Sequence, residues 1–422
     1  MKQIKEIFRR KSSLWLVLEL ILVTVACWWT FDPVLVTGTV IRMKPGYDVD
    51  RIVKLNVAGQ QITTIADEEE RLLQQVQELE DVELAYLDAY TDPLGFGTIF
   101  WSNYYYHDSD SLKVFRHDFL KDSRIFEVYG IQSLTPEVPT SELTHDCEWG
   151  DETVIITRSM AMGLFGTIDV AGRSVTGMDY GLLENGGYGW AKKPYRIRAV
   201  VEDVRHNARD RDLATVFLCT TRGETLTPII VRLREGVNAE SFVESHKQQL
   251  QVEMETEHCY IRDFQTARDA FWESIDHYKN GRQVRRNLFI AAFFSVNMAF
   301  GVFGTLLMYT RQRREEAGVK RAFGATRWSI FWGFIREAWL LTTVSVVIGC
   351  IIWFQFATTK GLCDNFPSQN PAVRLWFDSF WSHFLVVSIF VYLIILCFVV
   401  LGTVIPAWRI SRSKITESLR EE

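Results

Sequence analysis

The sequence predicts an α/β membrane protein in which four transmembrane helices carry a large mixed α/β domain, inserted between the first and second helices. Three observations predict this fold class. The 422-residue chain contains four apolar runs, each close to the roughly 20 residues that a helix needs to cross a bilayer. The 255 residues between the first two runs alternate between strand-like and helix-like patterns. The mean hydropathy of +0.01 is what an average over two such parts gives.

The apolar runs cover residues 14–31, 288–309, 330–357 and 384–405. Helices of soluble proteins rarely stay apolar on every face over such lengths. The first run has no small-residue cleavage site and ends in aromatic residues suited to a membrane interface. We therefore expect it to be an uncleaved anchor rather than a signal peptide.

Lysine and arginine residues flank the runs unevenly. Five lie in segment 1–13, six in the loop 311–328 and four in the tail 406–422, whereas the loop 358–381 contains only Lys360 and Arg374. The positive-inside rule therefore predicts that both termini and the 311–328 loop are cytoplasmic. Segment 1–13 is expected to be an amphipathic helix on the inner leaflet.

The formal net charge of −6 divides in the same way. Segment 32–286 holds 28 basic and 42 acidic residues, a net charge of −14, whereas the remainder holds 18 and 10, a net charge of +8. This balance excludes nucleic acid as a partner by bulk charge. The basic remainder is expected to lie against anionic membrane lipid.

The elements of segment 32–286 follow from their local patterns. We expect strands where β-branched residues gather or alternate, and helices where apolar residues recur at helical spacing. The expected strands are 34–43, 51–65, 82–87, 153–156, 195–201, 215–218 and 228–233. The expected helices are 67–79, 119–128, 159–165, 238–250 and a stalk over 262–286.

The 311–328 loop contains Glu316-Ala317-Gly318-Val319-Lys320-Arg321-Ala322-Phe323-Gly324-Ala325-Thr326. This segment resembles the E-I-G-V-R-K-A-L-G-A-T signature of the FtsX-like permeases, also called MacB-type or type VII ABC permeases. The tail from Pro406 to Arg420 resembles their P-A-x-R-x-A-R…P-x-E-A-L-R ending, and weaker motifs between 154 and 237 also match. Two residues depart from the pattern: Ala317 replaces a branched aliphatic residue, and Thr416 replaces a proline.

The resemblance implies an organisation for the chain. Residues 32–106 and 222–280 would form a porter-like subdomain, and 107–221 an inserted Sabre-like subdomain. It also implies a multi-pass protein of the bacterial inner membrane that forms a dimer with a like or unlike permease chain. A cytoplasmic ABC ATPase would bind this dimer, and a periplasmic adaptor or outer-membrane channel would be a further partner.

The resemblance further implies mechanotransmission, in which ATP hydrolysis in the cytoplasm moves the periplasmic domain to export a peptide, an antibiotic or a lipoprotein. The chain has no G-x-x-x-x-G-K-[ST] motif, so we expect ATP and magnesium on a separate ATPase chain and no cofactor here. The alternative is an FtsX-type regulator that activates a cell-wall hydrolase without transport. We expect no enzyme, because no coherent set of catalytic residues is present.

The contact with the ATPase is expected in the 311–328 loop. A short helix here would place acidic residues one turn before basic ones, expose an apolar side and end at a glycine. The alternative is a solvated loop beside the lipid headgroups. The residues assigned to coupling are Glu315, Glu316, Gly318, Val319, Lys320, Arg321, Ala322, Phe323, Gly324 and Ala325.

Three charged residues fall inside the apolar runs, where each costs about 2.5–3.5 kcal/mol on insertion scales. They are Glu19, Arg336 and Glu337. Glu19 and Arg336 lie at similar depths from the cytoplasmic side, so one hypothesis pairs them. The alternative is that each reaches the headgroups separately.

An aromatic cluster precedes residue 107. Phe100, Trp101, Tyr104 and Tyr105 are assigned as a possible contact for a substrate or partner, with core packing as the alternative. His117-Asp118 is expected to be an exposed polar pair. No metal site is expected, because His145 and its neighbours lack a second cluster of ligands. The pairing of Cys147, Cys219, Cys259 and Cys363 stays open.

Overall fold

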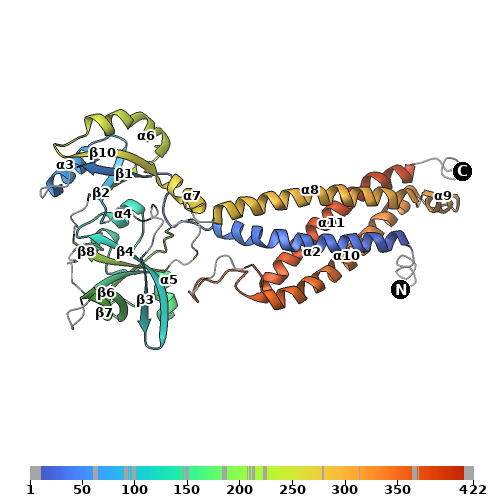
Figure 1. Cartoon of the computed structure of the whole chain (residues 1–422), viewed down its shortest axis with the longest axis horizontal. Coiled ribbons are helices and arrows are strands. Elements are labelled where there is room, and N and C mark those ends of the chain that lie inside the picture. The colour runs from blue at the N-terminus through green and yellow to red at the C-terminus, as the bar shows by residue number, and fades with distance from the viewer. Residues whose placement is uncertain are drawn as a thin grey trace. The chain divides into compact units, whose positions relative to one another are not determined.

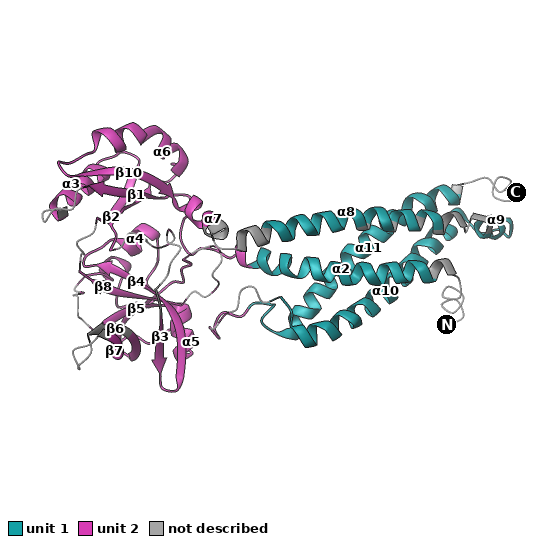
Figure 2. Cartoon of the chain, viewed as in Figure 1, with its two compact units in different colours: residues 1–39, 282–365, 375–422 teal, residues 40–281, 366–374 magenta. Residues whose placement is uncertain are grey.

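The computed structural model divides the chain into two compact units (Figure 2). The helical unit comprises residues 1–39, 282–365 and 375–422, and the α/β unit comprises residues 40–281 and 366–374. The structure describes residues 11–412 except 60–64, 90–93, 95, 97–100, 146, 148–151, 183–187, 207, 209–210, 212–213, 222–225, 278–279, 313, 364–367 and 369. Segment 1–10 and the last ten residues, with the expected amphipathic segment and part of the tail motif, lie outside the described residues.

Four long helices build the helical unit (Figure 1). By length and composition, the described residues contain four helices apolar enough to cross a membrane. The helices are α2 (Lys11–Ile41), α8 (Asn280–Gln312), α10 (Arg327–Lys360) and α11 (Phe380–Arg412). A short helix, α9 (Arg314–Ala322), separates α8 from α10.

Helix α2 runs ten residues beyond the apolar run that predicts it. The strand expected over 34–43 is therefore wrong, because α2 continues to Ile41 and contains Pro33. Its Val36 and Val40 are fully buried. Burial in the folded chain thus outweighs the strand preference of this valine-rich stretch, since intrinsic propensity is a weak prior.

The core of the helical unit joins α2, α10 and α11. Trp28 of α2 is fully buried and stacks on Trp353 and Phe384. Gly349 of α10 lies against Thr24 of α2 so closely that a Cβ atom there would be 2.6 Å from the Cβ of Thr24. By contrast, only 6% of the apolar window of α8 is buried, so three of the four long helices provide nearly all of this core.

The α/β unit contains two sheets. The first has the strand order β10-β1-β9-β2, and its neighbouring strands are antiparallel. Its main core includes Leu72 of α3 and Phe242 of α6. The elements of this layer are β1 (Ile52–Gly59), α3 (Ile65–Gln77), β2 (Val82–Leu87), β9 (Ile229–Leu233), α6 (Ala239–Gln248), a π-helix (Gln249–Glu253) and β10 (Cys259–Thr266).

The second sheet closes into a barrel with the order β3-β4-β8-β5-β7-β6. Its interior core includes Tyr105, Ile156 and Val216. The elements of this part are β3 (Trp101–His107), β4 (Asp110–Leu120), α4 (Ile125–Tyr129), a 3-10 helix (Thr140–Glu142), β5 (Thr153–Thr157), α5 (Arg158–Phe165), β6 (Ser174–Leu182), β7 (Tyr188–Val201) and β8 (Thr215–Thr220).

A third cluster of buried residues joins the two sheets. It combines Ile52 and Ile230 of the first sheet with Phe119 and Phe217 of the barrel. Phe126 of α4 packs against both Phe119 and Phe217. The two sheets therefore share one continuous core. Helix α7 (Ala267–His277) follows β10 at the end of the unit.

Three expectations for this unit differ from the structure. Residues 119–120 end strand β4, and only Ile125–Tyr129 of the expected helix 119–128 is helical. Residues 262–266 belong to β10, so the helical stalk begins at Ala267. Strand β3 lies in the barrel, whereas the boundary from the sequence placed residues up to 106 with the first part. Local patterns cannot assign such residues, because strand pairing is decided by distant segments.

Candidate functional site

Helix α9 is held on the helical unit by its buried side. Ala317 packs in a cluster with Ile330 and Phe334 of α10 and with Ala407 and Ile410 of α11. Gly318 is also buried. The small side chain of Ala317 lets α9 approach both helices closely. Ala317 is also the residue at which this segment departs from the family signature, so that departure lies at this contact.

The end of α9 is defined by Gly324. This residue has a φ of 91°, the left-handed region that glycine adopts at no steric cost. Its N–H donates to the carbonyl of Arg321 at 3.0 Å, and the N–H of Ala325 donates to the carbonyl of Lys320 at 3.0 Å. This is a Schellman ending, so the helix stop expected at Gly324 is present.

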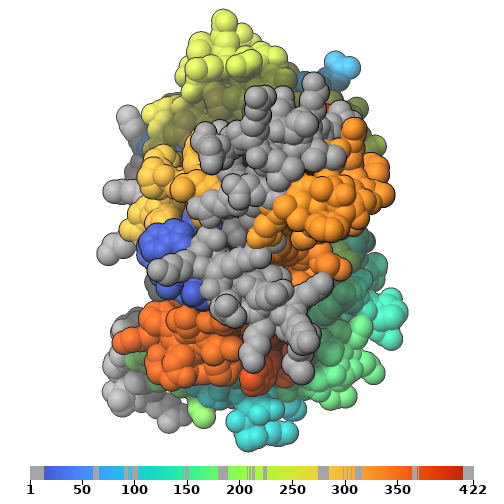
Figure 3. All heavy atoms as spheres, turned by 90° about the vertical axis from the view of Figure 1, so that its right-hand side faces the viewer, coloured from blue at the N-terminus to red at the C-terminus, as the bar shows by residue number. Residues whose placement is uncertain are grey.

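The other side of α9 faces away from the unit. Val319 is 45% exposed and Phe323 is 88% exposed, and Lys320 and Ala322 are exposed as well. Figure 3 views the end of the helical unit at which α9 lies. Val319 and Phe323 lie four residues apart and so share one face of α9, where they form a small exposed apolar patch beside charged residues. The side chain of Glu315 lies outside the described residues.

The polar residues within the long helices do not pair as one hypothesis predicts. Thr305 Oγ1 of α8 donates to Glu19 Oε2 of α2 at 2.7 Å, and the other Glu19 oxygen lies beside Gly301. No ion pair joins Glu19 to Arg336 in the part of the chain that the structure describes. Glu337 is buried, at 9% exposure. The carboxylate of Glu19 thus connects α2 to α8.

A second polar contact in this unit escapes the sequence analysis. His383 Nε2 of α11 lies 2.6 Å from Asp32 Oδ1 of α2, and the N–H of Cys363 donates to Asp32 Oδ2 at 3.0 Å. Both side chains are nearly inaccessible, at 2% and 5% exposure. Trp376 and Phe377 pack on the imidazole ring. Asp32 was placed just outside the first apolar run, and only the continuation of α2 brings it inside.

The aromatic cluster near residue 104 divides between core and surface. Tyr105 is fully buried in the barrel and packs near Tyr195, whereas Tyr104 is 45% exposed. Successive residues of a strand point to opposite faces, which accounts for the difference. Phe100 and the side chain of Trp101 lie outside the described residues. Core packing is thus correct for Tyr105, and Tyr104 is the cluster's exposed described member.

His117 and Asp118 are buried, at 6% and 2% exposure, so the expected exposed polar pair is wrong. Arg116 forms a bidentate contact with Asp118 at 2.7 and 2.9 Å. His117 Nε2 lies 3.9 Å from Asp88 Oδ2. Burial lowers the pKa of the neighbouring His206 to about 3, so that ring is neutral. These residues lie where β4 is covered on both faces, which an alternating pattern cannot reveal.

Cys147, Cys219, Cys259 and Cys363 form no disulfide in the part of the chain that the structure describes. Cys219 Sγ donates to the carbonyl of Cys147 at 3.2 Å, which fixes the segment after the 3-10 helix against β8. Cys147 and Cys219 thus lie close together without forming a disulfide.

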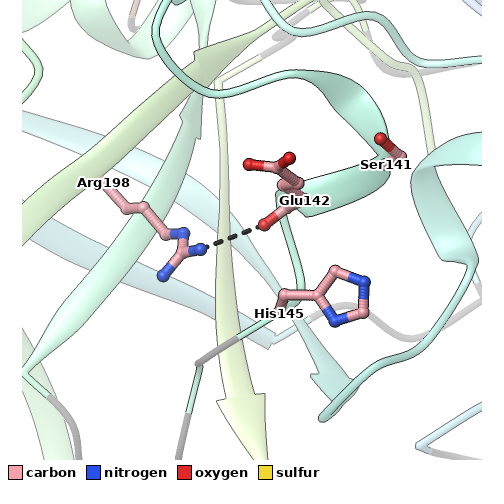
Figure 4. A pocket seen from close by; sticks show the side chains of 4 residues that line it. All are labelled: Ser141, Glu142, His145 and Arg198. Atoms are coloured by element: carbon pink, nitrogen blue, oxygen red, sulfur yellow. Dashed lines mark hydrogen bonds between the residues drawn. The ribbon is translucent and has the colours of Figure 1, made fainter.

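A pocket opens beside this segment (Figure 4). It has a volume of about 470 Å³ and is lined by Ser141, Glu142, His145 and Arg198. Arg198 comes from β7, and its NH2 group donates to the carbonyl of Glu142 at 3.0 Å. His145 Nδ1 lies 2.6 Å from Asp122 Oδ1. No sequence pattern predicts this pocket, because its sides come from segments more than 50 residues apart.

These features define a class of protein: a membrane-anchored α/β protein in which a short amphipathic helix connects two long apolar helices. Residues 288–415 match the family model described as FtsX-like permease C-terminal. This part of the chain is therefore an FtsX-like permease domain, and the resemblance to the FtsX-like and MacB-type ABC permeases is confirmed.

Two curated relatives are similar to parts of the chain. The macrolide export ATP-binding/permease protein MacB of Mannheimia succiniciproducens is 24% identical over 172 residues, which are 39% of this chain and 26% of that protein. MacB of Marinobacter nauticus is 35% identical over 63 residues, 15% of this chain and 10% of that protein. The chain spans about a quarter or less of the length of these relatives.

Among solved structures, the periplasmic region of MacB from Actinobacillus actinomycetemcomitans is 12% identical. It matches 57% of this chain and 99% of that chain with a TM-score of 0.31.

Proposed function

We propose that this chain is the permease subunit of an ATP-driven mechanotransmission ABC complex that exports a peptide, an antibiotic or a lipoprotein. In this proposal α2, α8, α10 and α11 span the bacterial inner membrane and both termini lie in the cytoplasm. A second permease chain and a separate cytoplasmic ATPase, which carries ATP and magnesium, complete the complex. A periplasmic adaptor or outer-membrane channel is a further proposed partner.

The observation that carries this proposal is the two-sided character of α9. Its inner side is fixed on α10 and α11 through Ala317, and its outer side exposes Val319 and Phe323. A force applied to the outer side therefore reaches two long helices through a packed contact. Packed interiors transmit displacement because they are dense and barely compressible.

The two sheets of the α/β unit fit the porter-like and Sabre-like assignments in outline. The first sheet combines chain segments 52–87 and 229–266, and the barrel forms from segment 101–220 inserted between them. Such a discontinuous first part with an inserted second part supports the proposed organisation. Both parts share one core, so we propose that they move together when the stalk moves.

The test is co-purification from native membranes. The tagged chain should retain an ATPase that mass spectrometry identifies by its P-loop. Phe323→Asp and Arg321→Glu should lower the ATPase yield at least tenfold, whereas Phe323→Leu should retain it because the apolar contact survives. Tyr260→Asp is a matched control, since Tyr260 is an exposed aromatic residue, at 44%, in the other unit.

Unchanged ATPase yield in both charged variants would reject the coupling role of α9. A cell-wall hydrolase could instead be recovered with the α/β unit, and export could be unchanged when this chain is deleted. These two results together would favour the regulatory role over transport.

A further inference from the structure

The pocket beside the barrel combines a cation and an anion that do not pair with each other. Arg198 of β7 and Glu142 of the 3-10 helix both line the pocket. Their contact is between the guanidinium and the main-chain carbonyl, not the carboxylate. Figure 4 shows the Arg198 side chain reaching this carbonyl, with the Glu142 carboxylate outside the hydrogen bond. The two charges are thus both available in one cavity.

Arg198 has donors to spare. A guanidinium carries five N–H donors, and one of its nitrogens, NH2, donates to the Glu142 carbonyl. Its Nε is buried and inaccessible to a ligand, so the donors left for a ligand are the remaining N–H groups of NH1 and NH2. No carboxylate forms an ion pair with Arg198 within the described ranges. A half-buried cation without an anion is costly, and a bound anion offsets this cost. The planar guanidinium suits a carboxylate in particular.

His145 adds a third polar group to the lining of the pocket. An ionised carboxylate only accepts hydrogen bonds, so Nδ1 of His145 donates to Asp122 at 2.6 Å. This contact fixes the ring and leaves Nε2 for a ligand. The Ser141 hydroxyl adds a donor and an acceptor on the same wall.

We propose that this pocket binds the free ends of a short peptide. The peptide carboxylate lies on Arg198 and its ammonium group lies on Glu142. The volume of about 470 Å³ falls within the roughly 300–1,000 Å³ of small-ligand pockets. The four described lining residues are polar, which suits an occupant with two charged ends.

Peptide binding here would narrow the substrate class of the proposed exporter to peptides. This step rests on the proposed function. Binding itself is measured without the ATPase. A failure of α9 to couple and a failure of this pocket to bind are therefore separate results.

Isothermal titration calorimetry on the full chain in detergent tests the proposal with trialanine as the probe. Trialanine with free ends should bind saturably, and its C-terminal amide should bind at least tenfold more weakly. N-acetylation should weaken binding several-fold. Arg198→Gln should remove the difference between acid and amide, and Glu142→Gln should remove the difference between free and acetylated amine.

Two variants distinguish a specific loss of binding from a loss caused by misfolding. The Glu142 carboxylate is exposed and accepts no hydrogen bond from any described residue, so Glu142→Gln leaves the fold intact. Arg196→Gln is the matched control, because Arg196 is an exposed arginine on β7 that does not line the pocket. It should bind every peptide as the unmodified chain does.

Equal affinity for the acid and the amide would overturn the proposal, as would the absence of saturable binding at millimolar trialanine. Tighter binding of glycerophosphoethanolamine than of trialanine would overturn the peptide assignment in favour of a lipid headgroup.

Discussion

The helical unit and the α/β unit differ in how many large apolar side chains they leave exposed. In the α/β unit the large fully buried side chains include Phe126, Phe217 and Phe242, together with the charged Arg205. In the helical unit many large apolar side chains face outward, among them Phe289 at 72% and Phe300 at 74% exposure. The contacts between its helices combine the stacked Trp28, Trp353 and Phe384 with Thr24 on Gly349, Thr305 on Glu19 and His383 on Asp32.

The difference follows from the solvent of each unit. Water drives apolar side chains into a core, at about 25 cal/mol per Å² of buried apolar surface. Lipid provides no such force between helices, so small residues and hydrogen bonds hold the helices together. The two units therefore respond differently to the same substitution, which makes the comparison testable.

The largest effect is expected for phenylalanine in the two environments. Phe217→Ala should destabilise the α/β unit by about 3–5 kcal/mol, because it leaves a cavity in the core shared by both sheets. Phe300→Ala should change stability by less than about 0.5 kcal/mol, since its side chain is 74% exposed. Thermal unfolding of the full chain in detergent measures both. Equal losses would show that α8 is packed against protein rather than lipid.

Removal of one member of the buried Asp32–His383 contact should be nearly as costly. Asp32→Ala removes the carboxylate that contacts the buried His383 and accepts from the N–H of Cys363, so we expect a loss of about 3–5 kcal/mol. Asp32→Asn retains an acceptor and should cost less. The free energy of unfolding can be followed by titration with sodium dodecyl sulfate. If both variants unfold at the wild-type midpoint, hydrogen bonds do not stabilise this unit.

A smaller effect is expected where two helices approach closely. Gly349→Ala places a methyl group 2.6 Å from the Cβ of Thr24, and overpacking of this kind costs about 1–3 kcal/mol. Gly333→Ala on the same helix meets no atom within 4 Å, and it should stabilise the helix by up to about 1 kcal/mol. The same unfolding assay separates them. A stabilised Gly349→Ala variant would contradict the close contact.

The smallest effect is a pH dependence confined to the α/β unit. Hydrogen bonds from Thr256 and His258 lower the pKa of Glu68 to about 2, and Glu68 raises the pKa of His258. The Glu68 contribution is present above its unfolded pKa, near 4.3, and is lost as pH falls toward 2. The His258 contribution is present below about pH 6.5 and is lost as pH rises through its raised pKa.

Together these shifts make the pair most stabilising between about pH 4.3 and 6.5. Thermal unfolding of the chain and of Glu68→Gln across pH 3–9 should show the difference shrinking on both sides of this window. A difference that is independent of pH would reject the ionic contact. Glu244→Gln is a control, because Glu244 is an exposed residue of α6 outside this cluster.

Much of the fold could be predicted from local patterns. The four apolar runs all lie in long helices, and the expected strands over 82–87, 195–201 and 228–233 correspond to β2, β7 and β9. The errors share one cause. Residues 34–43 and 119–128 prefer one structure by composition and adopt another because their neighbours in space decide.

The candidate sites also divide into features that follow from local sequence and features that depend on tertiary packing. The helix ending at Gly324 follows from a local rule and appears as expected. The partner of Glu19 is Thr305 rather than Arg336, and that choice depends on how α2 and α8 pack. Similarly, Tyr104 and Tyr105 carry the same chemistry, and only the barrel assigns one to the surface and the other to the core.

By itself, the sequence determined where the chain is apolar, where it is charged and where a helix must end. These properties depend on neighbouring residues, because periodicity, charge and glycine at positive φ are local. Tertiary structure alone decided the closed barrel, the Asp32–His383 contact and the pocket of Arg198 and Glu142. Each of these joins residues separated by tens to hundreds of positions, and only the packing of whole elements determines which of them meet.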